Sequence, residues 1–400
     1  MSNMTVLGTD LTQPDIYLDL NLTWPDTTET VKVDYFEFRN SNAEVQYSPI
    51  LSTAEQINDY LSFYYIPLLV LTGSIGNILS VFVFFKTKLK KLSSSYYLAA
   101  LAVSDTCFLL GLFVQWLNIV DVSLYNREVF CQFFTFSSNL CSFLSVWFVV
   151  AFTVERFIAV IHPLKRQSMC TVKRAKIVLC GLTILGCIHC MPFVFFASPK
   201  FDEKINATIC DVRPEYKHHM TIMNYVDTVV VFVVPFTAIV VLNTFTGCTV
   251  WKFATVRRTM TTHKRKITNS SQIKVTKMLL IVSTVFVCLN LPSYVMRVRA
   301  FLEVKASKAT IIIQYICWFL FLTNFGINFV LYCVSGQNFR KAVISMFRKV
   351  SSSTQRDGAT QVTVSEYVRN SGTGTSRRRT VTQNGSWNDV HELRQIISLK

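Results

Sequence analysis

Seven apolar segments, each long enough to cross a bilayer, constrain this 400-residue chain more than any other feature. They lie at residues 60–85, 95–120, 131–154, 175–196, 225–251, 275–298 and 309–334. A helix rises about 1.5 Å per residue, so about twenty apolar residues span the hydrocarbon core. Charged residues make up only 16% of the chain, against about a quarter in soluble proteins. We therefore expect an all-α membrane protein that folds as a bundle of seven transmembrane helices.

Basic residues gather in the connections after the first, third and fifth segments. Lys86, Lys88, Lys90 and Lys91 follow the first segment, and residues 252–277 hold eight bases and no acid. Because short cytoplasmic loops are enriched in Lys and Arg, these connections are expected to be cytoplasmic, which puts the amino terminus outside. The same loops account for the net charge of +16, so we do not expect nucleic-acid binding.

Three regions follow from this topology. Residues 1–59 are expected to be an extracellular, disordered tail, since acids there outnumber the two bases, Lys32 and Arg39. Residues 60–349 hold the seven segments and a short amphipathic eighth helix, and residues 350–400 form a disordered cytoplasmic tail rich in Ser and Thr. Short glycosylation motifs, which also occur by accident, stand on the outer side at Asn3, Asn21 and Asn206.

The third segment carries the most specific pattern. It begins at Cys131 and ends in the triplet Glu155-Arg156-Phe157, with Cys131 twenty-five residues before Arg156. This resembles the third helix of rhodopsin-like (class A) G-protein-coupled receptors, which ends in an Asp/Glu-Arg-Tyr-like triplet. The topology leaves Cys131 and Cys210 on the oxidising outer side. The resemblance implies that they form a disulfide between this helix and the second outer loop.

Other segments carry the same resemblance with departures. Residues 101–105 match the Leu-Ala-x-x-Asp motif, and Asn328 and Tyr332 keep the spacing of Asn-Pro-x-x-Tyr. Phe329 replaces the proline of that motif, which puts the usual kink in doubt. Asn290 stands where many members have a tryptophan. The switch and G-protein-coupling residues that the resemblance implies are Glu155, Arg156, Pro235, Phe286, Pro292 and Tyr332.

A buried carboxylate in the second segment needs partners. In similar receptors the positions of Asp105, Ser145, Asn324 and Asn328 surround a sodium ion with oxygen ligands, which suit a hard cation. A polar network filled by water, with no dedicated ion, is the alternative. No other cofactor is expected.

The ligand class follows from what the outer cavity lacks. Ser138 stands where amine receptors have an aspartate, and residues 309–334 contain no lysine for retinal. A mixture of amides, hydroxyls, aromatic rings and one arginine suits a peptide. The expected lining is Gln115, Trp116, Thr135, Ser138, Asn139, Tyr294, Arg297, Gln314 and Trp318. Trp116 and Trp318 would alternatively pack only at the membrane interface.

We therefore expect a plasma-membrane receptor for an extracellular neuropeptide, coupled to a heterotrimeric G protein, with arrestin and receptor kinases acting on the tail. The stretch 93–101 is similar to invertebrate neuropeptide receptors, among them the CNMamide receptors. A receptor for a non-peptide ligand and a membrane transporter are the rivals. No internal repeat supports a transporter, and the segments hold too few reactive side chains for an enzyme.

Overall fold

The computed structural model describes residues 49–202, 207–259, 266–302, 308–357, 363–366 and 379–382. The chain divides into two units, residues 1–340 and residues 341–400. Asn3, Asn21 and Asn206 lie outside the described residues, so their glycosylation stays a prediction.

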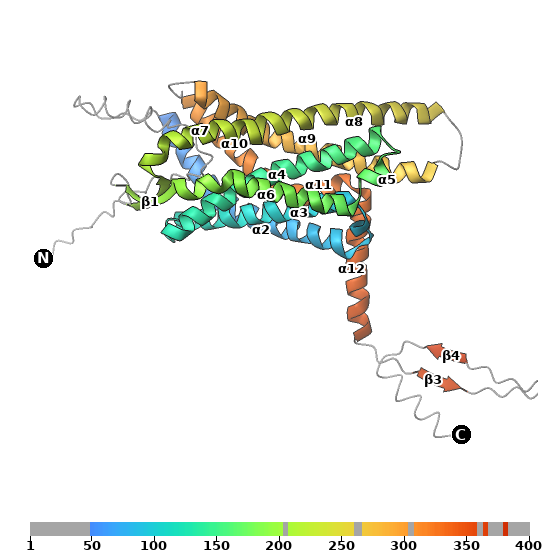
Figure 1. Cartoon of the computed structure of the whole chain (residues 1–400). Coiled ribbons are helices and arrows are strands. Elements are labelled where there is room, and N and C mark those ends of the chain that lie inside the picture. The colour runs from blue at the N-terminus through green and yellow to red at the C-terminus, as the bar shows by residue number, and fades with distance from the viewer. Residues whose placement is uncertain are drawn as a thin grey trace, which may run out of the picture. The chain divides into compact units, whose positions relative to one another are not determined.

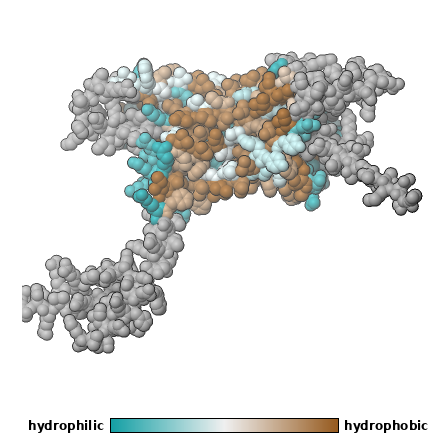
Figure 2. Space-filling model, turned by 180° about the vertical axis from the view of Figure 1, so that it is seen from behind, coloured by the Kyte–Doolittle hydropathy of each residue, from teal (hydrophilic) through white to brown (hydrophobic). Residues whose placement is uncertain are grey.

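The first unit is a helical bundle (Figure 1). Seven stretches of the described residues are long and apolar enough to cross a membrane, which confirms the predicted fold. Figure 2 shows hydrophobic residues over the middle of the bundle and hydrophilic residues toward its two ends. The spans are formed by α2 (Pro49–Lys86), α3 (Ser93–Trp116) with η2 (Leu117–Val120), α4 (Glu128–Ile161), α6 (Val172–Phe196), α7 (Lys217–Asp227) with η4 (Thr228–Val233) and α8 (Val234–Thr259), α9 (Lys266–Leu302), and α10 (Lys308–Gly326) with α11 (Asn328–Ser335).

Several helices begin earlier than their apolar segments. Helix α2 begins at Pro49, so residues 49–59 are helical, ahead of the apolar segment that begins at residue 60. Helix α7 similarly begins at Lys217, ahead of the apolar run at 225. Hydropathy marks only the part of a helix that lipid surrounds, whereas backbone hydrogen bonds can continue into water. Proline also suits the first turn of a helix, where its missing N–H is not needed.

Short elements connect the spans. They are η1 (Lys88–Lys91), α5 (Arg166–Met169), β1 (Ala197–Asp202), β2 (Ala207–Val212) and η3 (Pro214–Tyr216). Strands β1 and β2 pair antiparallel between α6 and α7, with Pro199 opposite Cys210. This sheet is a departure from the all-helical expectation. The β-branched residues Thr208, Ile209 and Val212 favour extended backbone there.

The seventh span is interrupted even though it lacks the usual proline. Helix α10 ends at Gly326 and α11 begins at Asn328. The Nδ2 of Asn77, on α2, donates to the carbonyl oxygen of Phe325 at 2.9 Å. A side chain from another helix thus occupies an acceptor at the point where the helical ladder breaks. Phe329, which takes the place of the proline, packs against Gly76.

Helices α2 and α10 approach each other closely at two glycines. An added Cβ on Gly73 would lie 2.8 Å from the Cα of Gly326. Around this contact lies a buried cluster that includes Ile66, Leu69 and Phe325. Its other members are Val70, Phe108, Leu109, Leu112, Cys141, Phe321 and Leu322. The glycines therefore permit the tight packing that places the broken part of the seventh span beside α2.

Helix α12 (Gln337–Asp357) begins in the first unit, where Phe339 is buried against Phe84 and Tyr332. Arg340 donates to the carbonyl oxygens of Cys333 and Val334, which lie at the end of α11. The second unit holds the rest of α12 and the antiparallel pair β3 (Thr363–Glu366) and β4 (Arg379–Thr382). Helical structure therefore runs past residue 349, into the region we expected to be disordered.

Candidate functional site

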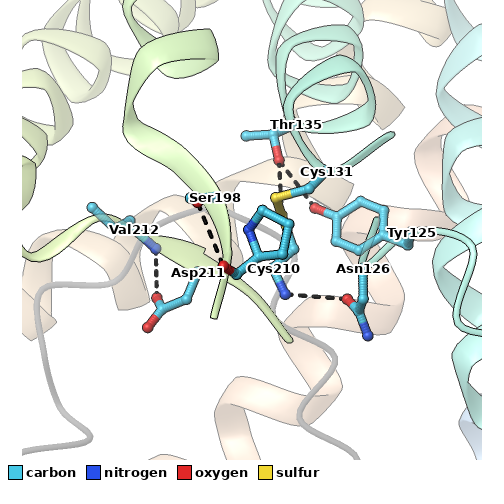
Figure 3. The surroundings of a disulfide bond; sticks show 9 residues. Tyr125, Asn126, Cys131, Thr135, Ser198, Cys210, Asp211 and Val212 are labelled. Carbon is cyan, nitrogen blue, oxygen red and sulfur yellow. Dashed lines mark hydrogen bonds between the residues drawn. A yellow bond between two sulfur atoms is a disulfide. The ribbon is translucent and has the colours of Figure 1, made fainter. Parts of the chain in front are cut away.

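A disulfide ties the loop between α6 and α7, which holds strands β1 and β2, to helix α4. Cys131 and Cys210 are bonded, as the sequence predicted, and Cys210 lies on β2 (Figure 3). The backbone N–H of Cys210 donates to the Oδ1 of Asn126 at 3.1 Å. The hydroxyls of Tyr125 and Thr135 lie 3.1 Å apart beside the disulfide. The loop between α6 and α7 is thus held over the outer end of α4 by one covalent bond and a buried polar cluster.

Two residues expected to line the ligand site, Thr135 and Asn139, have partners within the protein, and their contact with a ligand stays a prediction. The Thr135 hydroxyl contacts Tyr125 and also lies 3.7 Å from the Sγ of Cys210. Asn139 is half-buried and donates to the Thr135 carbonyl oxygen, one turn earlier on α4. Thr135 therefore supports the disulfide, and Asn139 supports its own helix.

The two tryptophans pack against neighbouring helices. Trp116 donates from Nε1 to the carbonyl oxygen of Phe63 on α2 and stacks on Phe113. Trp318 stacks on Phe321 and packs against the core cluster of α2, α3 and α10. Both rings pack against other residues of the bundle, and whether either also contacts a ligand stays a prediction. Gln314, which was also expected to line the ligand site, is half-buried on α10.

Five buried polar atoms in the outer half have no hydrogen-bond partner within the described part of the chain. Two belong to the connections, the Oδ1 of Asn118 and the Nε of Arg213. The other three lie on the spans and are the Oε1 of Gln115, the Oγ of Ser138 and the Nε of Arg297. Ser138 lies beside Gly111, where an added Cβ would stand 3.3 Å from its oxygen. Gln115 lies one turn after Gly111 on α3. The side chains of Gln115 and Ser138 therefore lie on the adjacent helices α3 and α4. Buried groups of this kind are uncommon in folded proteins unless something outside the chain satisfies them.

Arg297 takes part in a buried ionic cluster that sequence reasoning missed. Its Nη1 donates to the Oδ2 of Asp227 at 2.8 Å, and its Nη2 lies 3.4 Å from the Oδ1 of Asn224. The Oδ1 of Asp227 lies 3.2 Å from the Nε2 of His189. Asp227 ends α7, while His189 belongs to α6 and Arg297 to α9. We call Arg297, Asp227 and His189 the outer ionic triad; it joins the fourth, fifth and sixth spans.

The sequence carried a signal for this triad. Asp227 is a carboxylate inside the fifth apolar segment, and Arg297 is a base near the outer end of the sixth. Charged groups inside membrane segments usually face the bundle interior and pair with one another. Applying the argument made for Asp105 to Asp227 would have suggested Arg297 as its partner. The contribution of His189 could not be inferred in this way, because it depends on how α6 is rotated.

Aromatic rings fill the space below the triad. Tyr294 stacks on Phe232 with the ring planes 2° apart, and Phe236 contacts both Tyr294 and Phe286. Phe232 belongs to η4, a π-helical turn that ends two residues before Pro235. π-turns are uncommon and are enriched at functional sites. The cluster links the fifth and sixth spans next to their prolines.

Two of the three residues expected around Asp105, Ser145 and Asn328, donate hydrogen bonds to its carboxylate. Ser145 donates from Oγ to Oδ1 of Asp105 at 3.0 Å, and Asn328 donates from Nδ2 to Oδ2 at 2.6 Å. Asp105 is fully buried, and Asn324 is buried one turn before Asn328 on the seventh span. The set of carboxylate, hydroxyl and amide oxygens is chemically suited to a small hard cation. Asn328 would have to turn its amide to present oxygen to such an ion.

At the other end of α4, Glu155 and Arg156 form a buried ion pair. The thiol of Cys170 donates to the Glu155 carbonyl oxygen at 3.7 Å, and burial together with the Glu155 charge raises the pKa of this thiol. Tyr332 is fully buried and packs against Phe84. Gln272, which stands where similar receptors often have a second acid, lies on α9 outside the residues whose side chains are described.

A link between the fifth and sixth spans was also missed. Asn243 donates from Nδ2 to Ser283 at 2.8 Å, and Ser283 can donate in turn to Asn243 at 3.1 Å. Asn243 is a polar residue inside the fifth apolar segment. Its partner could not be chosen without the relative rotation of α8 and α9.

Comparisons with known proteins agree with this geometry. The pattern described as "7 transmembrane receptor (rhodopsin family)" matches residues 76–332. The human cysteinyl leukotriene receptor 1 is 29% identical over 293 residues, covering 70% of this chain and 83% of the relative. The mouse thyrotropin-releasing hormone receptor is 28% identical over 312 residues, covering 71% and 77%. The Drosophila melanogaster FMRFamide receptor is 26% identical, covering 94% of this chain and 67% of the relative. The chain belongs to the rhodopsin family of seven-transmembrane, G-protein-coupled receptors.

Proposed function

We propose that this receptor binds an extracellular neuropeptide in the outer half of the bundle and signals through a heterotrimeric G protein. The observation that carries the proposal is the set of unpartnered buried atoms on Gln115, Ser138 and Arg297. A peptide backbone offers carbonyl acceptors and N–H donors at close spacing, so it can satisfy an amide oxygen, a hydroxyl and a guanidinium together. The residues expected to contact it are Gln115, Ser138, Tyr294, Arg297 and Gln314.

Two of the relatives are named for peptides, thyrotropin-releasing hormone and FMRFamide, and one for leukotrienes. A leukotriene-like ligand is therefore the second candidate. The polar atoms favour the peptide, because a peptide carries donors and acceptors along its whole backbone, and each buried group left without a partner costs about 1–3 kcal/mol.

The CNMamide receptors are the subgroup we propose to test first. Their resemblance rests on residues 93–101, which begin α3, and Ser93 there donates to the Cys170 carbonyl oxygen in the loop after α4. That contact lies at the cytoplasmic end in our topology. The resemblance therefore supports kinship and says little about how the ligand is recognised.

The test is a library of neuropeptides and leukotrienes applied to cells that express the receptor, with calcium and cAMP as readouts. We expect peptides to activate and leukotrienes to be silent. Activation by leukotrienes alone would overturn the peptide proposal.

A pair of variants connects activation to the site. Ser138→Ala removes an unpartnered hydroxyl, and one lost neutral hydrogen bond corresponds to about a three- to tenfold rise in EC50. Ser74→Ala removes an unpartnered hydroxyl from α2 and serves as the control. Equal EC50 values for the two variants would exclude Ser138 from the site.

Transmission to the G protein would follow from movement of α9. Agonist binding near Tyr294 and Arg297 would favour outward movement of the inner part of α9 about Pro292, with Pro235 and Phe286 in the adjacent aromatic cluster. The Glu155–Arg156 pair would open so that Arg156 faces the G protein. The equilibrium shifts only by the ligand's differential affinity for the two states.

Two further components complete the proposal. A sodium ion held by Asp105, Ser145, Asn324 and Asn328 would favour one arrangement of the inner bundle by bringing a cation to a buried carboxylate. The Ser- and Thr-rich tail would be the substrate of receptor kinases, and the phosphates would recruit arrestin.

A further inference from the structure

The hydrogen-bonded pair of Asn243 and Ser283 joins the fifth and sixth spans in their inner halves. Asn243 lies nine residues before the end of its span at Lys252 (252 − 243 = 9). Ser283 lies eight residues after its span begins at Val275 (283 − 275 = 8). Both residues are therefore at a similar depth, toward the loops expected to be cytoplasmic. Among the side chains of α8 and α9 that the structure describes, this pair forms the only hydrogen bond between the two helices.

Both polar atoms of the Asn243 amide contact the Ser283 hydroxyl. The Nδ2 lies 2.8 Å and the Oδ1 lies 3.1 Å from the Ser283 Oγ. Ser283 is fully buried, and its hydroxyl can also donate to the Leu279 carbonyl oxygen, one turn earlier on α9, at 2.9 Å. A hydroxyl has one proton and two lone pairs, so it can donate to Leu279 while it accepts from Asn243. Ser283 thus has a partner on its own helix, and the link to α8 depends on Asn243.

The pair lies far from the bend of α9. Pro292 lies inside this helix, nine residues after Ser283 (292 − 283 = 9), a distance of about 13.5 Å along the axis. A change of about 10° at the proline would therefore displace Ser283 by about 2.3 Å. Such a displacement away from α8 would lengthen the 2.8 Å contact beyond hydrogen-bonding distance. The bond can therefore form only while the inner part of α9 lies close to α8.

The charged groups at the inner end do not supply an equivalent restraint. Glu155 engages Arg156, its neighbour on α4, so this ion pair does not reach α9. Gln272 on α9 offers Arg156 no charge. The bond from Asn243 to Ser283, by contrast, crosses directly between helices and needs no charge.

We infer that Asn243 is a positioning residue that holds the inner part of α9 against α8 through Ser283, and so restrains the receptor from activating a G protein before a ligand binds. This restraint rests on the proposed coupling to a G protein. A hydrogen bond between membrane helices shifts the equilibrium between two arrangements by about three- to tenfold. Loss of the bond should therefore raise ligand-free signalling by about that factor.

The first test is Asn243→Ala in the full-length receptor. The variant leaves Ser283 its partner at Leu279, so the serine hydroxyl does not lose its last hydrogen bond. Ligand-free activation of each class of Gα subunit, at matched surface expression, should rise about three- to tenfold over the wild type. Thr244→Ala is the control, because the Thr244 hydroxyl is exposed and donates at 2.8 Å to the Val240 carbonyl oxygen of its own helix. Ligand-free signalling should be unchanged in this control.

A double-variant cycle separates the contact from a general loss of stability. Ser283→Ala should also raise ligand-free signalling, and the double variant should signal no more than the stronger single variant, because both substitutions remove one bond. Ser283→Thr keeps the hydroxyl and should signal like the wild type. A double variant whose signalling equals the product of the two single effects would overturn the inference, since the two side chains would then act independently.

A second measurement does not depend on a G protein. Spin labels carried by unnatural amino acids at Thr255 and Lys277, which are exposed on α8 and α9, report the distance between the inner ends of these helices. In the purified, ligand-free receptor, Asn243→Ala should increase the population of long distances about three- to tenfold, and Thr244→Ala should not.

The two measurements distinguish the possible failures. More long distances in Asn243→Ala, with no G protein activated by any variant, would keep the restraint and remove the proposed coupling. A distance distribution in Asn243→Ala that equals the wild-type distribution would overturn the inference, whatever the signalling. Unchanged ligand-free signalling by Asn243→Ala, in a receptor that activates a G protein when Ser283 is replaced, would also overturn it.

Discussion

Replacing Gly73 with alanine should destabilise the bundle because α2 and α10 leave no room for a methyl group. The new Cβ would lie 2.8 Å from the Cα of Gly326 and 2.9 Å from the Cδ1 of Leu109. Ordinary van der Waals contact begins near 3.4 Å, so restoring it would require the backbones to separate by about 0.6 Å (3.4 − 2.8). Leu109 can change rotamer, but the Cα of Gly326 cannot move without its helix.

The size of the effect follows from two opposing contributions. Overpacking costs about 1–3 kcal/mol, whereas alanine is favoured over glycine inside a helix by about 0.8–1.0 kcal/mol. Gly181 on α6 supplies the matched control, since an added Cβ there meets nothing within 4 Å. Both variants replace a helical glycine with alanine, so the gain in helix propensity is the same in each and cancels in the comparison. Gly73→Ala should therefore be less stable than Gly181→Ala by about 1–3 kcal/mol.

Thermal unfolding of the detergent-solubilised receptor, followed by size-exclusion chromatography, measures this difference. At about 2 °C per kcal/mol, the melting temperatures should differ by roughly 2–6 °C. Gly326→Ala should cost less than Gly73→Ala, because its Cβ meets the end of the Leu69 side chain, which can rotate away. Equal melting temperatures for Gly73→Ala and Gly181→Ala would refute the close approach of α2 and α10.

The remaining predictions concern the disulfide, the buried carboxylate and the inner switch. Cys131→Ser or Cys210→Ser should reduce surface expression or agonist binding, because the closed loop of 79 residues corresponds to about 4.5 kcal/mol in a free chain; flow cytometry and radioligand binding measure both. Asp105→Asn should abolish the dependence of agonist affinity on sodium, judged against a matched organic cation; a wild-type receptor indifferent to sodium would exclude the ion. Arg156→Ala should abolish G-protein activation in a nucleotide-exchange assay while agonist affinity persists. Gln272→Glu should lower ligand-free signalling at matched surface expression by adding a charged partner for Arg156, and unchanged basal signalling would contradict this.

Much of the membrane architecture could be predicted because it depends on single segments. Apolar length marks a span without reference to its neighbours, and Cys131 and Cys210 could be paired from their side of the membrane and the family resemblance. Helix ends such as Pro49 could not be located in this way, because a helix can continue beyond the membrane into water, where its residues are polar and hydropathy gives no signal.

Contacts between helices were harder to predict, because they depend on rotation as well as depth. Asp227 and Arg297 are separated by 70 residues, and only the structure shows that His189 completes their cluster. The break in the seventh span is a similar case. The sequence lacks the proline that would have marked it, and the group at the break, Asn77, comes from the first span.

The outer ionic triad also has a consequence for how the receptor is made. Asp227 is synthesised 70 residues before Arg297, an interval of roughly 4–14 s at 5–20 residues per second. During this interval the fifth segment holds the Asp227 carboxylate, and His189 is the only one of its two triad partners that has been synthesised. A single charge adds about 2.5–3.5 kcal/mol to membrane insertion at a helix centre and less near a helix end, where Asp227 and Arg297 lie. Because the pair can close only after α9 leaves the translocon, the sixth segment completes the neutralisation of the fifth, and the outer half of the receptor matures late in biogenesis.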